Sequence, residues 1–361
     1  MIDFIPLQAY AHVVNTIILG TVLLVALLVM RHPYAVVEHP GVRNRVPGML
    51  GTMLLVTLCV LIGLRPISYA FGDMGNYYKQ FVKYAAGATP EGRDPVFELL
   101  MWLFAQANAP TLFFLTCALV YLVPLKLASV RALGHYWPLG FLFLISHVSF
   151  YGFAVNGIRN GMAMSLFVWA ITLPRWRAWA LMAVSVGLHA SLLLPVVAYA
   201  IASARFKVQW ALLFWLLCLA VSLLFPGTAS VLAGWLPADD RLEHYAALGD
   251  EFADQFSSTG YRWDFVLYGA LPIALGTFFL LRKKQLDAFY MRTFQIYILT
   301  NAVWLLLIRV PFSNRFAYLS WGIMGLVCAY PFVKWKIFRQ QQVVFAVLLT
   351  GLCSFAYLLQ S

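Results

Sequence analysis

The sequence has 361 residues, of which 62% are hydrophobic and 11% are charged, and its mean hydropathy is +0.80. Runs of about 18 or more apolar residues recur along it, as in membrane-spanning helices, and the short alternating segments of a transmembrane β-barrel are absent. The net charge of +11 comes without a basic tail or an aromatic–basic RNA-binding motif. We therefore attribute it to basic cytoplasmic loops and exclude a nucleic-acid partner.

This composition predicts an all-α polytopic integral membrane protein that forms a single transmembrane domain over residues 1–361. Ten apolar runs each predict one span, and they cover residues 12–30, 48–64, 110–128, 136–153, 157–174, 208–225, 263–281, 293–310, 316–333 and 343–359. A further apolar stretch at 176–203 is long for one span and short for two.

The charges of the loops decide between one span and two in this stretch. If 176–203 is a central hairpin of two short helices, nine later basic residues are cytoplasmic and four are outside, and a single span inverts that count. The positive-inside rule therefore favours the hairpin, about 12 transmembrane helices in all, and an N-terminus outside. The acidic residues agree, because only Glu38 and Asp287 are then cytoplasmic.

Two long segments lie outside in this topology, at 65–110 and 226–264. The second part of the first segment is apolar, contains Glu98 and is too short for a span, so we expect an interfacial or re-entrant helix there. In the second segment, Pro237 followed by Asp239 predicts the start of a short surface helix.

Arg159 is the most unusual polar residue, because it lies near the outer end of the apolar run at 157–174. A charged group at membrane depth costs about 2.5–3.5 kcal/mol for a central arginine, so it needs a partner. A guanidinium flanked by Asn156 and Asn160 at the start of a helix suits a phosphate group. The alternatives are an arginine that reaches the lipid headgroups or pairs with a carboxylate.

Other candidates share this outer face. His189 lies at the outer turn of the hairpin and is either a general base or a packing residue. Asp73, followed by Tyr77, suits a sugar hydroxyl next to an aromatic ring, or it is an ordinary loop cap. We add as candidates for substrate binding Arg65, Tyr77, Glu98, Arg309 and Arg315, the last two of which bracket a short outer turn.

The sequence contains no Walker A loop, GxSxG elbow, HExxH motif or DxD motif. Its five cysteines stand singly in apolar runs without a CxxC pair. We therefore expect neither a bound metal nor a cofactor, and no ATP-driven activity.

Several segments together resemble the EpsG family of Wzy-like polysaccharide polymerases over about residues 65–333. They are FGDMGNYYKQF, DPVFELL, AVNGIRNGMAMSLFVWAI, VGLHAS, STGYRWDF and FSNRFAYLSW. NGIRNG is the most specific of them, although this chain has Asn160 where glutamine is more usual.

The resemblance implies a bacterial inner-membrane enzyme whose active site faces the periplasm. Such an enzyme transfers a growing glycan from undecaprenyl pyrophosphate to the non-reducing end of another lipid-linked oligosaccharide unit. The implied functional positions are Asp73, Arg159, His189 and Arg315. Dependence on a chain-length regulator is left open.

The chemistry fits these residues. A pyrophosphate leaving group needs fixed positive charge and no acid, and the acceptor hydroxyl needs a base, which is His189 or Asp73. We expect a metal-independent, inverting transfer. The alternatives are an O-antigen ligase-type glycosyltransferase and a flippase for lipid-linked oligosaccharides. A flippase needs charged residues through the whole bilayer, whereas here they gather at the outer face.

Overall fold

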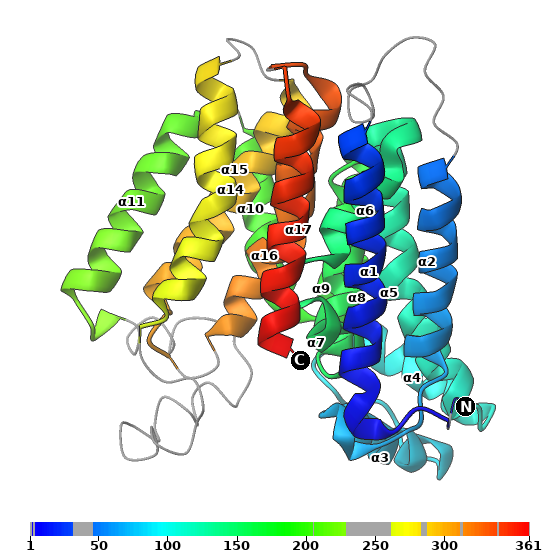
Figure 1. Ribbon diagram of the computed structural model, residues 1–361. Helices are drawn as coiled ribbons and strands as arrows, with labels where there is room; N and C mark the ends of the chain where they lie inside the picture. The colour runs from blue at the N-terminus through cyan, green and yellow to red at the C-terminus, as the bar shows by residue number, and fades with distance from the viewer. Residues whose placement is uncertain are drawn as a thin grey trace. The chain divides into compact units, whose positions relative to one another are not determined.

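The computed structural model describes residues 2, 4–31, 46–204, 206–228, 261–282, 287–310, 313–337 and 339–360. These residues form helices, turns and loops, and no β-strand occurs among them. The chain divides into two compact units (Figure 1): one comprises Met1–His189 with Cys328–Ser361, and the other comprises Ala190–Val327. That the whole chain is one transmembrane domain stays a prediction.

The first unit contains α1 (Tyr10–Arg31), α2 (Val46–Gly63), α3 (Met74–Ala85), α4 (Pro95–Gln106), α5 (Pro110–Leu133), α6 (Trp137–Ile145), α7 (Phe150–Val155), α8 (Ile158–Ala170), α9 (Arg175–Leu188), the end of α16 (Asn314–Lys334) and α17 (Gln341–Gln360). Helices α1 and α17 lie side by side and antiparallel, as Figure 1 shows, and the Asn15 amide donates to Gln360 Oε1 at 3.3 Å. Helices α5 and α8 run beside each other, with Ser165 near the Tyr121 carbonyl.

The predicted span at 136–153 is wrong as a single helix. Helix α6 ends at Ile145, and α7 covers only Phe150–Val155. In the break between them, the His147 ring nitrogen Nδ1 is bonded to Ser149 Oγ at 2.6 Å. A local side-chain bond of this kind competes with helix formation and stabilises a break.

The stretch at 176–203 contains two helices, as predicted. Helix α9 ends at Leu188, and α10 (Leu193–Ser203) follows after a turn of 3₁₀ helix at Ala190–Leu192. His189 has an extended backbone and terminates α9. The residue chosen from the sequence as a possible base therefore lies at a helix end, where its ring is not confined to a helix face.

The segment at 65–110, which is predicted to lie outside, contains more helix than expected. Helix α4 confirms the short helix predicted in its second part, but α3 was not predicted. The buried residues of α3 include Met74, Tyr77, Phe81 and Tyr84, which recur at helical spacing. Asp73 and Tyr77 were instead interpreted as parts of a sugar-binding loop, which is why the amphipathic period was missed.

The second unit contains α10, α11 (Val208–Leu224), α14 (Trp263–Arg282), α15 (Ala288–Leu306) and the first part of α16. A buried polar bridge joins three of these helices: the Trp215 indole donates to Asn301 Oδ1 at 2.8 Å, and the Asn301 amide donates to Ser320 Oγ at 3.1 Å. Interhelical bonds of this kind hold apolar bundles together. The surface helix predicted at Pro237 lies outside the described residues.

Among the described residues, five helical segments are long and apolar enough to cross a membrane: Leu7–Arg31, Pro110–Ile145 (α5 and α6 with the 3₁₀ turn between them), Trp263–Arg282, Asn314–Lys334 and Gln341–Gln360. Shorter apolar helices cover Gly48–Gly63, Pro95–Gln106, Ala190–Ser203 and Val208–Leu224. The chain is thus a membrane protein whose described part is all-helical. The count of about 12 crossings and the outer N-terminus stay predictions.

We expect Gly161→Ala to lower the thermal stability of the purified protein. A Cβ at Gly161 would lie 2.7 Å from the Phe153 carbonyl oxygen, so α7 and α8 must separate, at a cost of about 1–3 kcal/mol. Gly152→Ala is the matched control, because a Cβ there meets no atom within 4 Å. Equal unfolding temperatures for the two variants would contradict this account of the α7–α8 contact.

Candidate functional site

Arg159 is the second residue of α8, directly after the break between α7 and α8. Its side chain is 27% exposed, and its Nη1 atom donates to Asp94 Oδ2 at 2.7 Å. The guanidinium also lies over the rings of Tyr77 and Phe97, at 5.5 and 5.8 Å from their centres. Arg159 is therefore held by a carboxylate and two aromatic rings, which is one of the alternatives left open by the sequence.

His189, at the end of α9, contacts the same Asp94 carboxylate. Its Nδ1 atom lies 3.2 Å from Asp94 Oδ2, and its side chain is 24% exposed. The end of α9 comes close to α4, because a Cβ on Gly187 would lie 2.5 Å from the Val96 side chain. A glycine at this position allows the approach that brings His189 to Asp94.

Asp94 is the residue that the sequence interpretation did not single out. It directly precedes Pro95, the first residue of α4, and its side chain is only 5% exposed. A carboxylate at this position usually caps its helix, but this one makes no capping bond to α4. Its Oδ2 atom instead contacts both Arg159 and His189. The signal was present in the segment DPVFELL, where an aspartate precedes a proline at the start of a helix.

Asp73 lies at the start of α3, next to the same helix break. Its backbone N–H donates to Asn156 Oδ1 at 2.8 Å, and its Oδ1 atom accepts a bond from the Asn76 amide at 3.2 Å. Gly72 has φ +64°, and a Cβ there would lie 2.4 Å from Asn156 Oδ1. Four predicted positions, Asp73, Asn156, Arg159 and Tyr77, thus come together, since Tyr77 Oη lies 3.4 Å from Arg159 Nε.

The side chains of Arg65 and Glu98 are hydrogen-bonded to other groups of the protein. Arg65 is 2% exposed, donates to the carbonyls of Ile62 and Val155, and lies between two phenylalanine rings. Burial lowers the pKa of Arg65 to about 10, so the side chain remains charged at neutral pH. Glu98 is 9% exposed and accepts a bond from the Tyr84 hydroxyl.

Asn160 is buried in α8, and its Oδ1 atom has no hydrogen-bond partner. Arg309 and Arg315 belong to the second unit. Arg309 Nε donates to the Ser222 carbonyl at 3.4 Å, and its guanidinium lies 5.1 Å from the centre of the Tyr261 ring. Arg315 begins α16 beside Asn314, whose amide donates to the Tyr318 hydroxyl.

The sequence profile of the EpsG family matches residues 49–361. The chain belongs to the EpsG family. This is a family of Wzy-like polysaccharide polymerase-type proteins. No curated protein and no solved structure gave a significant match.

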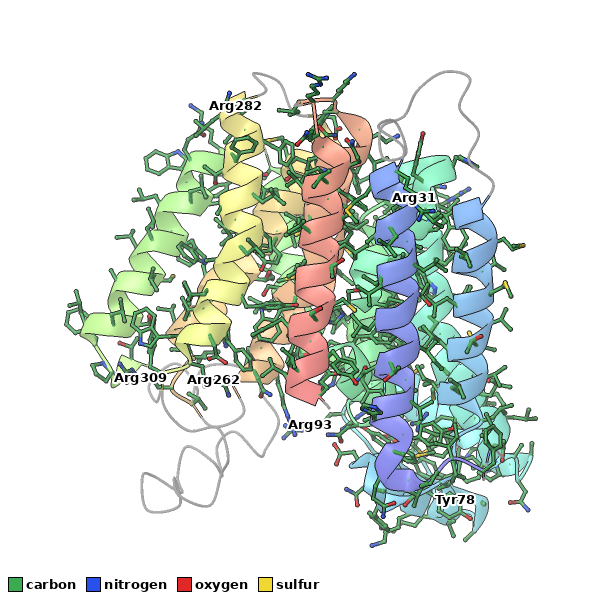
Figure 2. All side chains as sticks on the ribbon, in the orientation of Figure 1. Arg31, Tyr78, Arg93, Arg262, Arg282 and Arg309 are labelled. Carbon is green, nitrogen blue, oxygen red and sulfur yellow. The ribbon has the colours of Figure 1, made fainter. Side chains whose placement is uncertain are left out.

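In the first unit of this EpsG-family protein, the carboxylates lie at one end, and the opposite end has only basic residues among its described charges (Figure 2). All its described carboxylates lie at the end that holds α3 and α4, where Arg93 and Tyr78 are labelled, and they are Asp73, Glu91, Asp94 and Glu98. The opposite end, where Figure 2 labels Arg31, holds the end of α1, the end of α5 with the turn before α9, which Arg131 joins by its bond to the Thr172 carbonyl, and the chain between α16 and α17. The described charged residues of these segments are all basic: Arg31, Lys126, Arg131, Arg175, Arg177, Lys334, Lys336 and Arg339.

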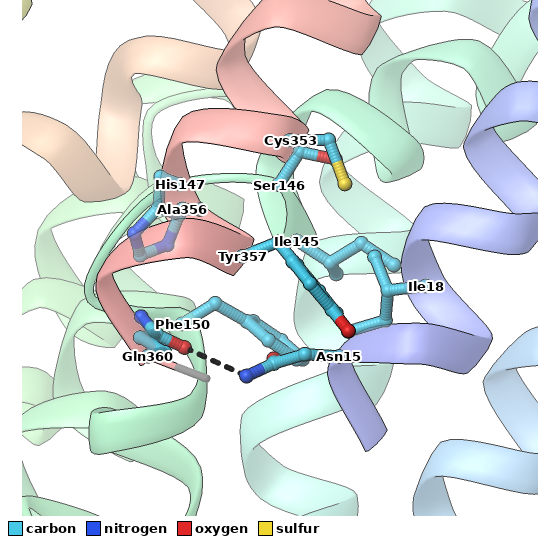
Figure 3. A pocket seen from close by; sticks show the side chains of 10 residues that line it. All are labelled: Asn15, Ile18, Ile145, Ser146, His147, Phe150, Cys353, Ala356, Tyr357 and Gln360. Carbon is cyan, nitrogen blue, oxygen red and sulfur yellow. Dashed lines mark hydrogen bonds between the residues drawn. The ribbon is translucent and has the colours of Figure 1, made fainter. Parts of the chain in front are cut away.

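Figure 3 shows a small pocket elsewhere in this unit, between α1, α17 and the break after α6. It has room for about one water molecule and is too small for a sugar. Its polar lining includes Asn15, Ser146 and Gln360. Within the described ranges, no group of three histidine, cysteine or carboxylate side chains is arranged to hold a metal ion.

We expect Tyr84→Phe to destabilise the α3–α4 pair. Burial, together with the hydrogen bond to Glu98, raises the pKa of Tyr84 to about 12, so Tyr84 is the donor in this bond near neutral pH. Its loss leaves a buried carboxylate without this partner, at a cost of about 1–3 kcal/mol. Thermal unfolding in detergent measures the effect, and Tyr78→Phe is the control, because Tyr78 is 38% exposed. A Tyr84→Phe protein as stable as the control would show that the bond contributes nothing.

Proposed function

We propose that this protein is a glycosyltransferase that polymerises lipid-linked oligosaccharide units at the periplasmic face of a bacterial inner membrane. The donor is a glycan on undecaprenyl pyrophosphate, and the acceptor is the non-reducing end of another lipid-linked unit. The observation that carries this proposal is the cluster of Arg159, Asp94 and His189 at the carboxylate-containing end of the first unit. Membership of the EpsG family supports the reaction class.

The cluster has the groups that the reaction needs. Arg159 is a partly exposed cation next to the helix break, and it stabilises the negative charge that develops on the departing pyrophosphate. Since a pyrophosphate leaves as an anion, no general acid is required. The acceptor hydroxyl gives its proton to a base, for which His189 and Asp73 are the candidates. One displacement inverts the configuration at the anomeric carbon, and no metal takes part.

The remaining predicted residues take supporting roles in this proposal. Tyr77 and Asn156 line the same break and contact sugar hydroxyl groups. Asn160 contacts the substrate after rotation of its buried amide, whose Oδ1 atom has no hydrogen-bond partner in the structure. Arg309 and Arg315 keep the role predicted from the sequence, which is binding of an anionic substrate group by the second unit. Arg65 joins the end of α2 to the end of α7, and Glu98 joins α4 to α3, so both residues support the surroundings of the cluster.

The charge distribution supports a periplasmic site. Basic residues favour the cytoplasmic side of a membrane protein, and the end marked by Arg31 carries basic residues alone among its described charges. The cluster lies at the other end. This distribution also favours an enzyme over a flippase, which would carry polar groups along the whole transport path.

Purified protein in detergent, given matched lipid-linked repeat units and excess EDTA, should form a ladder of glycan polymers. Arg159→Ala should lower the rate by about 100-fold or more, because it removes a fixed charge at the leaving group. Lys83→Ala is the control, since Lys83 is an exposed cation at the same end of the unit. Absence of polymer with folded wild-type protein would refute the transferase. A retained anomeric configuration would refute the single displacement.

The same assay decides between the two candidate bases. If His189 is the base, His189→Ala lowers kcat by about 10²–10⁴-fold, whereas Asp73→Asn changes mainly KM through its contacts with sugar hydroxyls. The reverse pattern would assign the base to Asp73.

Cysteine labelling tests the sidedness. The natural cysteines are all buried, so the wild-type chain is a low background for a membrane-impermeant maleimide. We expect Glu91→Cys to react in intact spheroplasts and Arg177→Cys to react only after the membrane is opened. The opposite pattern would place the cluster in the cytoplasm.

A further inference from the structure

One carboxylate oxygen connects the two residues on which the proposed function depends. Asp94 Oδ2 lies 2.7 Å from Arg159 Nη1 and 3.2 Å from His189 Nδ1. The three residues come from three parts of the chain, at the start of α4, the start of α8 and the end of α9. We infer that Asp94 is a positioning residue that orients the His189 ring as the general base, an inference that rests on the proposed function.

The contact at Nδ1 determines what the other ring nitrogen does. When a neutral imidazole donates its Nδ1–H to a carboxylate, its Nε2 atom becomes the hydrogen-bond acceptor. The same contact fixes the direction of the ring, as in histidines whose second nitrogen is held by a carboxylate. Asp94 therefore presents His189 Nε2 to the substrate as a proton acceptor.

The surroundings of Asp94 suit this role better than a structural one. At the start of α4 its carboxylate would ordinarily cap the helix, yet it makes no such bond. Its side chain is 5% exposed, and a buried carboxylate requires a cationic partner, which Arg159 provides. The carboxylate is thus kept ionised and directed to His189, at some loss to the stability of α4.

The reaction step balances with this arrangement. The acceptor hydroxyl passes its proton to His189 Nε2, while its oxygen forms a bond to the anomeric carbon of the donor. The bond from that carbon to the pyrophosphate oxygen breaks, and the electron pair leaves with the lipid pyrophosphate beside Arg159. The imidazolium that results is stabilised by Asp94 until the proton passes to water.

This arrangement also distinguishes His189 from Asp73. The His189 ring contacts the Asp94 carboxylate, whereas the Asp73 carboxylate accepts a bond from the Asn76 amide and the Asp73 backbone N–H donates to Asn156 Oδ1. Asp73 is accordingly assigned to binding the acceptor, and His189 to proton transfer.

The test is Asp94→Asn in the polymerisation assay with a defined lipid-pyrophosphate repeat unit. We expect kcat to fall by about 10–100-fold, the usual effect of removing a group that orients a functional histidine. KM should remain within about twofold, because the residue does not touch the substrate. Glu91→Gln is the matched control: it removes an exposed carboxylate three positions earlier in the chain and should behave as wild type. Asp94→Glu should recover part of the lost rate.

A double variant shows whether Asp94 acts through His189. In a His189→Gln background, Asp94→Asn should lower kcat by a clearly smaller factor than in the wild-type background, because the ring that it orients is gone and only its contact with Arg159 is lost. Losses that multiply would overturn the inference, and so would a normal kcat for Asp94→Asn. If Asp94→Asn does not fold, Asp94→Ser takes its place: a kcat lowered by about 10–100-fold supports the inference, and a wild-type kcat overturns it.

These outcomes separate the inference from the proposed function. Wild-type protein that makes no polymer from a matched repeat unit refutes the proposed function. Wild-type protein that polymerises, together with an Asp94→Asn variant of normal kcat, leaves the function intact and refutes the role of Asp94 alone.

Discussion

A carboxylate that is almost fully buried next to a membrane needs positive charge beside it, and this requirement organises the first unit. Asp94 obtains that charge from Arg159 on α8 and contacts His189 at the end of α9. Three chain segments must therefore end at one point. If one member of this group is removed, a buried charged partner is left unpaired. The loss of folding free energy is then larger than the contribution of a single contact.

Close backbone approaches make this meeting possible. Gly161 allows α8 to lie against the Phe153 carbonyl of α7, and Gly187 allows the end of α9 to reach Val96. The breaks around Asn156 and His189 then place polar backbone and side chains where continuous helices would present apolar faces. In membrane proteins, interruptions of this kind occur where the chain lines a polar site. Short helices at one end of the unit thus hold the polar cluster, and the long helices are those apolar enough to cross a membrane.

The sequence predicted much of this arrangement. Apolar run length located most of the long helices within a few residues, and charge counting predicted two helices at 176–203. Arg159, His189, Asp73 and Tyr77 were chosen as single unusual residues, and the structure brings them to one end of the first unit. Asp94 was not chosen, because its role comes from contacts with residues 65 and 95 positions away, which no local pattern contains. The predicted span at 136–153 was too long, because hydropathy does not detect the hydrogen bond between His147 and Ser149 in the break after α6.

The α3–α4 pair is stabilised mainly by contacts between its own two helices. Tyr84 bonds to Glu98 and Gln106, and the inner residues of α3 pack as an aromatic row, while Tyr78, Lys79 and Lys83 face outward. Its outer surface is therefore free to change in sequence without disturbing the helices that cross the bilayer. Substitutions at Tyr78, Lys79 and Lys83 therefore cost little in folding, so this face of the pair can differ between chains that share the buried cluster and the apolar helices.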